Sequence, residues 1–146
     1  MKLRTSLSAA GATAVLGITG ALLAPTAASA HSTTHTLKFI SVTKKSIMFT
    51  KTSSASQDTD VNATGKIIGF DMLYFKATSA TTAAVNITGD LNGGFLYGTG
   101  TINFKTGAFS NGKVTGRTGG FAGATGTIMA KAISSTKTAV TITYST

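Results

Sequence analysis

The feature that most constrains the fold of this chain is a series of β-branched and aromatic runs, separated by short glycine-containing breaks, that begins near Thr36. No stretch of this region spaces its apolar residues three or four apart, as an amphipathic helix requires. Short runs bounded by Gly, Asn and Asp are typical of strands. We therefore expect an almost entirely β domain, with strands at 36–42, 45–52, 66–77, 82–88, 94–104, 108–116, 125–134 and 138–145.

The breaks between these runs indicate antiparallel connections. Asn111-Gly112 is a strong reverse-turn pair, and the segments 89–94 and 105–107 carry the glycines of tight turns. The polar segment 53–65 is interpreted as a linker. Eight short strands at close spacing are typical of a barrel or a sandwich, and an eight-stranded antiparallel β-barrel is the predicted fold.

The first thirty residues have the organisation of a cleavable export signal. Lys2 and Arg4 give a positive start, 15–24 is an apolar run, and 28–30 (Ala-Ser-Ala) has the small-x-small form of a cleavage site. The apolar run has about half of the roughly 20 residues that a membrane-spanning helix needs. We expect cleavage after Ala30, a secreted bacterial protein without integral membrane association, and a single domain over 31–146.

Composition narrows the class of protein further. The chain has no cysteine, so a secreted domain of this size must be stabilised by packing and by a hydrogen-bonded sheet, which favours a closed barrel. Thirteen Lys and Arg residues outnumber four Asp residues. The lysines are scattered singly, apart from Lys44-Lys45, and form no basic stripe for nucleic acid. The charge still fits attraction to an acidic cell-surface polymer.

The predicted strand 66–77 is apolar on both of its faces. Successive residues of a strand point to opposite sides. One face would carry Ile67, Gly69, Asp71, Leu73 and Phe75, and the other Ile68, Phe70, Met72 and Tyr74. A strand without a polar face is covered on both sides, here by the barrel lumen and by either a covering segment or a partner subunit in a homo-oligomer.

The glycine-rich segment 116–126 reads GRTGGFAGATG. Its Gly120, Gly123 and Gly126 have the spacing of a dinucleotide-binding loop, but a strand follows in place of the required helix. No acidic residue occurs after Asp90 to bind a ribose. We therefore expect no nucleotide cofactor.

Together with its flanks, this segment resembles the late G-G-T-G-x-F-x-x-A-x-G run of the dirigent and allene oxide cyclase superfamily, with Arg117 where the family usually has Gly. Upstream, the acidic, glycine-punctuated stretch 58–71 is similar to the region before the second long strand of small bacterial members. The resemblance covers roughly residues 57–144. It implies an eight-stranded antiparallel barrel that binds an apolar small molecule in its lumen and steers its cyclisation or isomerisation without a cofactor.

The resemblance assigns the lumen carboxylate, and hence the catalytic role, to Asp71, with Asp60 as a weaker substrate-binding match. The residues themselves support a proton donor at Asp71, because apolar neighbours such as Leu73 and Phe75 disfavour the ionised form and raise the pKa. An acid-assisted cyclisation needs such a donor. The alternative is that Asp71 accepts hydrogen bonds and holds its strand in place.

Four further residues are candidate substrate-binding groups. Tyr74, Phe75 and Tyr97 would serve as aromatic walls, or simply as core aromatics. Arg117, the only arginine after residue 30, could clamp a carboxylate or enolate, or bond loop carbonyls. Both histidines lie at or before residue 35, so neither a Ser-His-Asp hydrolase nor a fixed metal site is expected.

Two hypotheses follow from the sequence. The first is a cofactor-independent cyclase or isomerase, and the second is a non-catalytic secreted barrel that binds a ligand or associates with the cell surface. A polar group including Asp71 at the floor of an open cavity would favour the first hypothesis. A lumen filled by Ile, Phe and Met side chains would favour the second.

Overall fold

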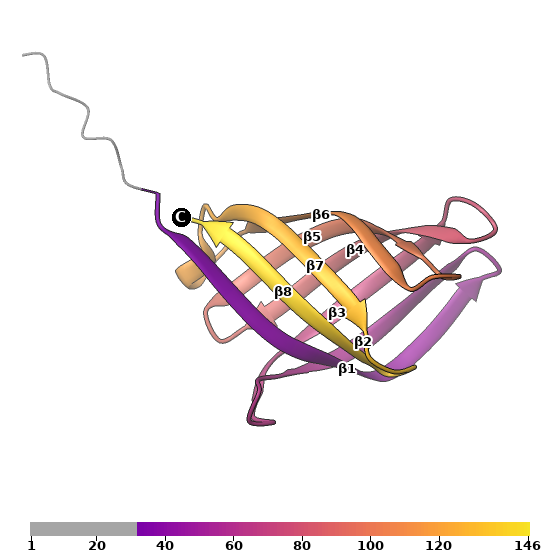
Figure 1. Cartoon of the computed structure of the whole chain (residues 1–146), viewed down its shortest axis with the longest axis horizontal. Helices are drawn as coiled ribbons and strands as arrows, with labels where there is room; N and C mark the ends of the chain where they lie inside the picture. Colours follow the sequence, from indigo (N-terminus) through magenta and orange to yellow (C-terminus); the bar gives the residue numbers. More distant parts are fainter. Residues whose placement is uncertain (1–31) are drawn as a thin grey trace, which may run out of the picture. The chain divides into compact units, whose positions relative to one another are not determined.

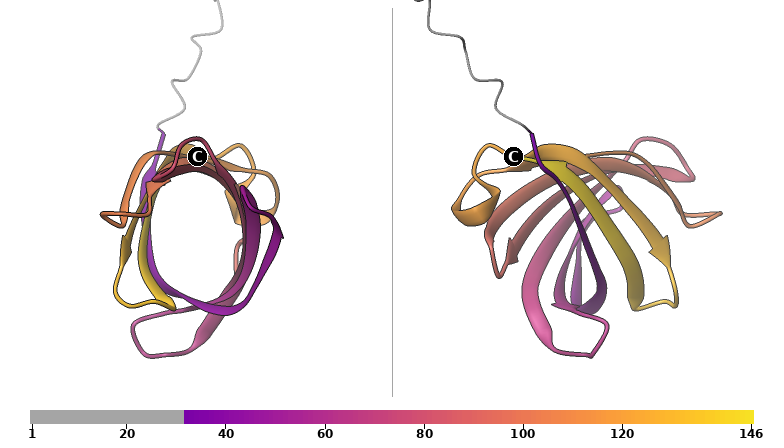
Figure 2. Two further views of the ribbon diagram at one scale, coloured as in Figure 1. Left: turned by 90° about the vertical axis from the view of Figure 1, so that its right-hand side faces the viewer. Right: turned by 60° about the vertical axis from the view of Figure 1, so that its left-hand side comes forward.

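The computed structural model describes residues 32–146, and these form a closed antiparallel barrel of eight strands arranged in sequence order (Figures 1 and 2). The predicted fold is therefore confirmed. The expected export signal, 1–30, and the expected start at His31 lie outside the described residues. The strands are β1 (Thr34–Thr50), β2 (Ser53–Val61), β3 (Ile67–Ala77), β4 (Thr82–Leu91), β5 (Gly94–Asn103), β6 (Ala108–Gly116), β7 (Thr125–Ala132) and β8 (Lys137–Ser145).

Helical structure is confined, among residues 32–146, to one 3₁₀ turn, η1 (Gly119–Phe121). No helix in this part of the chain is long and apolar enough to cross a membrane.

The structure corrects the prediction at the first hairpin. The predicted strands 36–42 and 45–52 merge into one 17-residue strand, β1, which ends at Thr50 and whose register shifts at a bulge between Thr43 and Lys45. The supposed linker 53–65 contains β2, which pairs with β1 on one side and β3 on the other. Strand pairing uses backbone N–H and C=O groups, so a polar segment forms a strand when both neighbours are available to it.

The barrel closes where β1 pairs with β8, from Thr34 opposite Ser145 to Val42 opposite Lys137. The two ends of the described chain therefore lie side by side, as Figure 1 shows. Closure leaves no strand edge free to pair with another chain. It also creates an interior in which residues distant in sequence face one another.

A buried apolar cluster fills part of this interior. Its members are Phe39, Leu91, Leu96, Val114, Phe121, Ala124, Ile128, Val140 and Ile142. Phe121 comes from η1, in the connection between β6 and β7, and its ring packs edge-on against Tyr144 at 5.3 Å between centroids. The glycine-rich segment thus contributes a side chain to the core of the barrel.

The alternation predicted along β3 holds from Gly69 onward. Asp71, Leu73 and Phe75 line the interior, whereas Phe70 and Met72 are exposed outside. Ile67 departs from this pattern and is exposed. The cause is a one-residue shift in the pairing of β3 with β2, between Asp60 and Val61. Ile68 packs against the core in place of Ile67. No segment of residues 32–146 covers the outer face at Met72, contrary to one of the two expectations.

Candidate functional site

An internal cavity of about 140 Å³ lies within the barrel and is partly open to solvent. It extends from the apolar core, where Leu91, Leu96 and Ile142 line it, toward Gly107 and Ala132 beside the β5–β6 and β7–β8 turns. Every strand contributes lining residues, and most of them are apolar. The lumen is therefore not completely filled by side chains.

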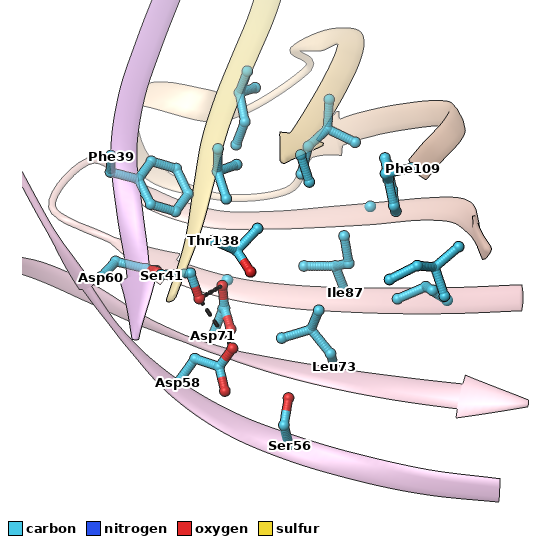
Figure 3. Close-up of a pocket in the computed structure, with 18 of the residues that line it drawn as sticks. Phe39, Ser41, Ser56, Asp58, Asp60, Asp71, Leu73, Ile87, Phe109 and Thr138 are labelled. Carbon is cyan, nitrogen blue, oxygen red and sulfur yellow. Dashed lines mark hydrogen bonds between the residues drawn. The ribbon is translucent and has the colours of Figure 1, made fainter. Parts of the chain in front are cut away.

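A cluster of three carboxyl groups interrupts this apolar wall. Alternation along β2 turns both Asp58 and Asp60 inward. Asp71 on β3 lies directly opposite Asp58, and Ser41 on β1 lies directly opposite Asp60. Pairing of three adjacent strands thus gathers three of the chain's four acidic residues at one side of the cavity (Figure 3). We call Asp58, Asp60 and Asp71 the acidic cluster.

The acidic cluster is almost completely buried and poorly supplied with hydrogen-bond donors. Asp60 is 0% exposed, and Asp58 and Asp71 are each 6% exposed. The Ser41 hydroxyl donates toward Asp58 Oδ2 at 3.0 Å and toward Asp71 Oδ2 at 3.3 Å, although its one proton serves one acceptor at a time. The other four carboxyl oxygens of the cluster have no hydrogen-bond donor among the described residues.

This environment changes the proton affinity of two of these groups. Burial, together with the negative charges of Asp60 and Asp58, raises the pKa of Asp71 to about 8. Burial, together with the negative charge of Asp58, raises the pKa of Asp60 to about 6. Near pH 7 the pair of Asp60 and Asp71 therefore holds about one proton between its two carboxyl groups. The cavity thus holds a neutral carboxylic acid beside carboxylate groups.

The structure brings together only part of the set of predicted site residues. Asp71, Asp60 and Phe75 all line the cavity. Tyr74 and Tyr97 are 39% and 44% exposed, and neither lines it. Each lies next in sequence to an inward-facing residue, so strand alternation places it on the outer wall.

Arg117 also lies away from the cavity. Its guanidinium group stacks over the Tyr97 ring, 5.7 Å from the ring centroid. The positions predicted for Tyr74, Tyr97 and Arg117 are therefore corrected: among the described residues, these side chains do not line the lumen. Contact with a substrate in the cavity would need a rearrangement of the barrel wall.

Sequence reasoning missed Asp58 and Ser41 as members of the site. Asp58 is missed because the interpretation of 53–65 as a linker removes β2 from the barrel wall. The spacing of Ser56, Asp58 and Asp60 carried a usable signal, since residues two apart share one face of a strand. Ser41 had no such signal, because its nearness to Asp58 and Asp71 depends on strand pairing.

The fold and the site define a class: a closed eight-stranded antiparallel barrel with an apolar, partly open cavity and a buried acidic cluster. A solved protein with a similar fold is AbnU, described as an exo-specific intermolecular Diels-Alderase. The two structures superpose with a TM-score of 0.63 at 10% sequence identity, over 78% of this chain and 99% of AbnU. At this identity the likeness concerns the fold. No protein-family model matches the sequence, and neither does any curated protein.

Proposed function

We propose that this protein binds an apolar small molecule in its barrel and steers the cyclisation or isomerisation of that molecule, with Asp71 as the proton donor. The observation that carries the proposal is a carboxyl group, protonated near neutral pH, that faces a partly open apolar cavity. The likeness to a barrel named as a Diels-Alderase is consistent with cyclisation chemistry in such a lumen. The resemblance to dirigent and allene oxide cyclase proteins supports the same class of reaction.

The geometry suggests how the reaction would proceed. Apolar walls such as Leu73 and Ile87 would hold a flexible substrate in a folded conformation and exclude water (Figure 3). Asp71 would then donate its proton to a substrate oxygen or double bond, which makes an adjacent carbon electrophilic and promotes ring closure or bond migration. No further cofactor takes part in this scheme.

The acidic cluster also determines where the proton goes afterwards. Once Asp71 has given up its proton, its carboxylate lies beside those of Asp60 and Asp58, and three adjacent negative charges are unfavourable in a buried site. Asp71 therefore recovers a proton from the product. A cycle that ends with the starting protonation state fits an isomerisation or cyclisation, in which substrate and product have the same composition.

The proposed location is outside the cell, where the export signal expected at 1–30 would deliver the protein. There it would meet its ligand in the medium or at the cell surface. Binding without catalysis is the second candidate function. It is favoured by the small number of polar groups in the lumen, where hydroxyl groups such as those of Thr43 and Thr138 are the polar side chains besides the acidic cluster.

The decisive experiment captures the ligand and follows its fate. Small molecules that the purified protein retains from bacterial culture extract are identified by mass spectrometry and then incubated with fresh protein. We expect conversion by the wild type and at least about a hundred-fold slower conversion by Asp71→Asn, because the amide has no transferable acidic proton.

Asp90→Asn is the matched control, since Asp90 is the one acidic residue outside the cluster and is exposed. It should convert the ligand at the wild-type rate. Equal conversion by Asp71→Asn would refute the catalytic role. Recovery of an unchanged ligand from every protein would favour the non-catalytic barrel.

A further inference from the structure

The acidic cluster lacks hydrogen-bond donors that a ligand could supply. Asp60 is fully buried, lines the cavity, and has no donor to either carboxyl oxygen among the described residues. Asp58 Oδ1 and Asp71 Oδ1 are also buried without a hydrogen-bond donor among these residues. The proton shared between Asp71 and Asp60 can satisfy one of these four oxygens. Unsatisfied buried acceptors of charged groups are costly, so donors brought by a bound molecule would stabilise the remaining oxygens. These oxygens are almost inaccessible to solvent, so a bound donor reaches them once the carboxyl groups turn toward the cavity.

The charged residues that line the cavity are all acidic. None of the lining residues found in 32–146 is Lys, Arg or His, and the elements around the cluster add only neutral groups: Ser41 from β1, Gly89 from β4 and Thr138 from β8. Asp58, Asp60 and Asp71 are thus the titratable groups that face one another here. A ligand carboxylate or phosphate would be repelled at this position, and a ligand hydroxyl would supply one donor without neutralising charge.

A metal ion is a poor alternative occupant. No group of three or more His, Cys, Asp or Glu side chains among the described residues is arranged so that it could hold a metal ion. The three carboxyl groups therefore share a wall of the cavity without converging on one coordination point. An ammonium group suits more widely spaced carboxyl groups better, because its N···O distances of about 2.7–2.9 Å exceed the roughly 2.0–2.6 Å of bonds from oxygen to Mg²⁺ or Ca²⁺.

These observations select a chemical class of ligand. We propose that the molecule bound in the cavity carries a protonated primary amine, whose three N–H groups donate to the acidic cluster while its apolar body lies against Leu73, Ile87 and Phe109 (Figure 3). The inference rests on the proposed function, because it names the substrate class of the same cavity. A volume of about 140 Å³ suits an enclosed body of roughly benzene size.

Binding of such a cation has a second consequence. An ammonium group beside the cluster favours the ionised form of Asp71, which is mainly protonated in the free protein near pH 7. The amine should therefore displace the shared proton into solvent as it binds. A neutral or anionic ligand has no reason to do so.

The test compares three probes of the same shape: benzylamine, benzyl alcohol and benzoate. Each is titrated into the protein at pH 7, and binding is followed by NMR from the methyl resonances of Leu73 and Ile87. We expect benzylamine to bind at least about ten-fold more tightly than benzyl alcohol, because charged hydrogen bonds form in one complex alone, and benzoate to bind least. Calorimetry in two buffers of different ionisation enthalpy should show proton release with benzylamine only.

Three variants test whether the acidic cluster causes the preference for benzylamine over benzyl alcohol. Asp60→Asn should reduce the preference for benzylamine over benzyl alcohol to less than about three-fold, since a fully buried carboxylate that would accept from the ammonium group is lost. Asp58→Asn should act in the same direction, and Asp90→Asn should leave the preference unchanged, because Asp90 is exposed on β4 outside the cavity. Benzyl alcohol that binds as tightly as benzylamine, or a preference that Asp60→Asn leaves intact, would overturn the inference. In either case the proposed binding of apolar molecules would still stand. If none of the three probes shifted the methyl resonances of Leu73 and Ile87, the amine preference and the proposed function would both be overturned.

Discussion

At the scale of single residues, the most informative feature is that the acidic cluster is unfavourable for folding. Asp58, Asp60 and Asp71 are buried without a facing cation, and Ser41 is a single weak donor between two of them. Apolar or amide side chains at these positions would stabilise the barrel better. Groups that are costly for stability and converge on a cavity are typical of functional sites.

The raised pKa values predict an unusual dependence of stability on pH. Asp71 and Asp60 have folded-state pKa values of about 8 and about 6, both above the value near 3.9 that an unfolded Asp shows. The folded state therefore binds more protons between about pH 4 and pH 8, and stability must fall as the pH rises through this window.

Thermal unfolding measured between pH 4 and pH 9 checks this prediction. We expect a loss of stability on the order of a few kcal/mol across the window, with the part above pH 6 absent in Asp71→Asn. Asp90→Asn should retain the full dependence, because its side chain is exposed on β4. A melting temperature that increases steadily from pH 4 to pH 8 would contradict a protonated Asp71.

At the scale of elements, the glycine-rich segment 116–126 has a structural explanation. It folds back toward the start of β5, where the Phe95 N–H donates to Thr118 Oγ1 at 3.0 Å and Phe121 enters the core. Gly116 makes this possible, since a Cβ atom there would lie 1.6 Å from the carbonyl oxygen of Phe121. The segment thus closes part of the barrel interior with a side chain of its own.

Two glycines of this segment provide a matched pair of substitutions. Gly116→Ala should destabilise the protein by about 1–3 kcal/mol or more, because the methyl group and the Phe121 backbone cannot both keep their positions. A Cβ atom at Gly120 would lie 3.5 Å from its nearest neighbour, the Gly93 carbonyl oxygen, which is an ordinary contact. Gly120→Ala should therefore be tolerated. Denaturant unfolding of both variants measures the difference, and equal stability would refute the proposed packing.

At the scale of the whole molecule, charge is divided between the interior and the surface. The chain has a formal net charge of +9, and three of its four acidic residues lie in the cavity. Asp90 is the exposed exception among the described residues. The outer surface is therefore basic while the lumen is acidic, which suits attraction to anionic surfaces outside and capture of a cationic group within.

Export is a prediction for the molecule as a whole. Expression of the full chain in a secreting bacterium should release a product into the medium whose intact mass corresponds to a chain that begins at His31, because the site at 28–30 has the form that a signal peptidase cleaves. Replacing Ala28 and Ala30 by large residues should retain the precursor in the cells. A full-length product in the medium would contradict cleavage at this position.

Local chemistry by itself determined much of this protein. The period of two along β3 put Asp71, Leu73 and Phe75 on one face, because it depends on neighbouring residues alone. The turn glycines predicted in 89–94 and 105–107 lie at or beside the two ends of β5. The reverse turn predicted at Asn111-Gly112 is wrong, because both residues lie within β6, where the register with β5 shifts. The same period of two put Tyr74 on the face opposite to Asp71, and the structure shows that this face is the outer wall rather than the substrate site predicted for Tyr74.

Only the tertiary structure decided which of these inward-facing residues meet. The polar strand β2 exists because β1 and β3 both pair with its backbone, and that pairing alone brings Asp58 opposite Asp71 and Ser41 opposite Asp60. The raised pKa of Asp71 follows from this arrangement, since burial and neighbouring charge depend on residues that lie far apart in sequence. Alternation states which way a side chain points, but strand pairing and barrel closure determine what it faces.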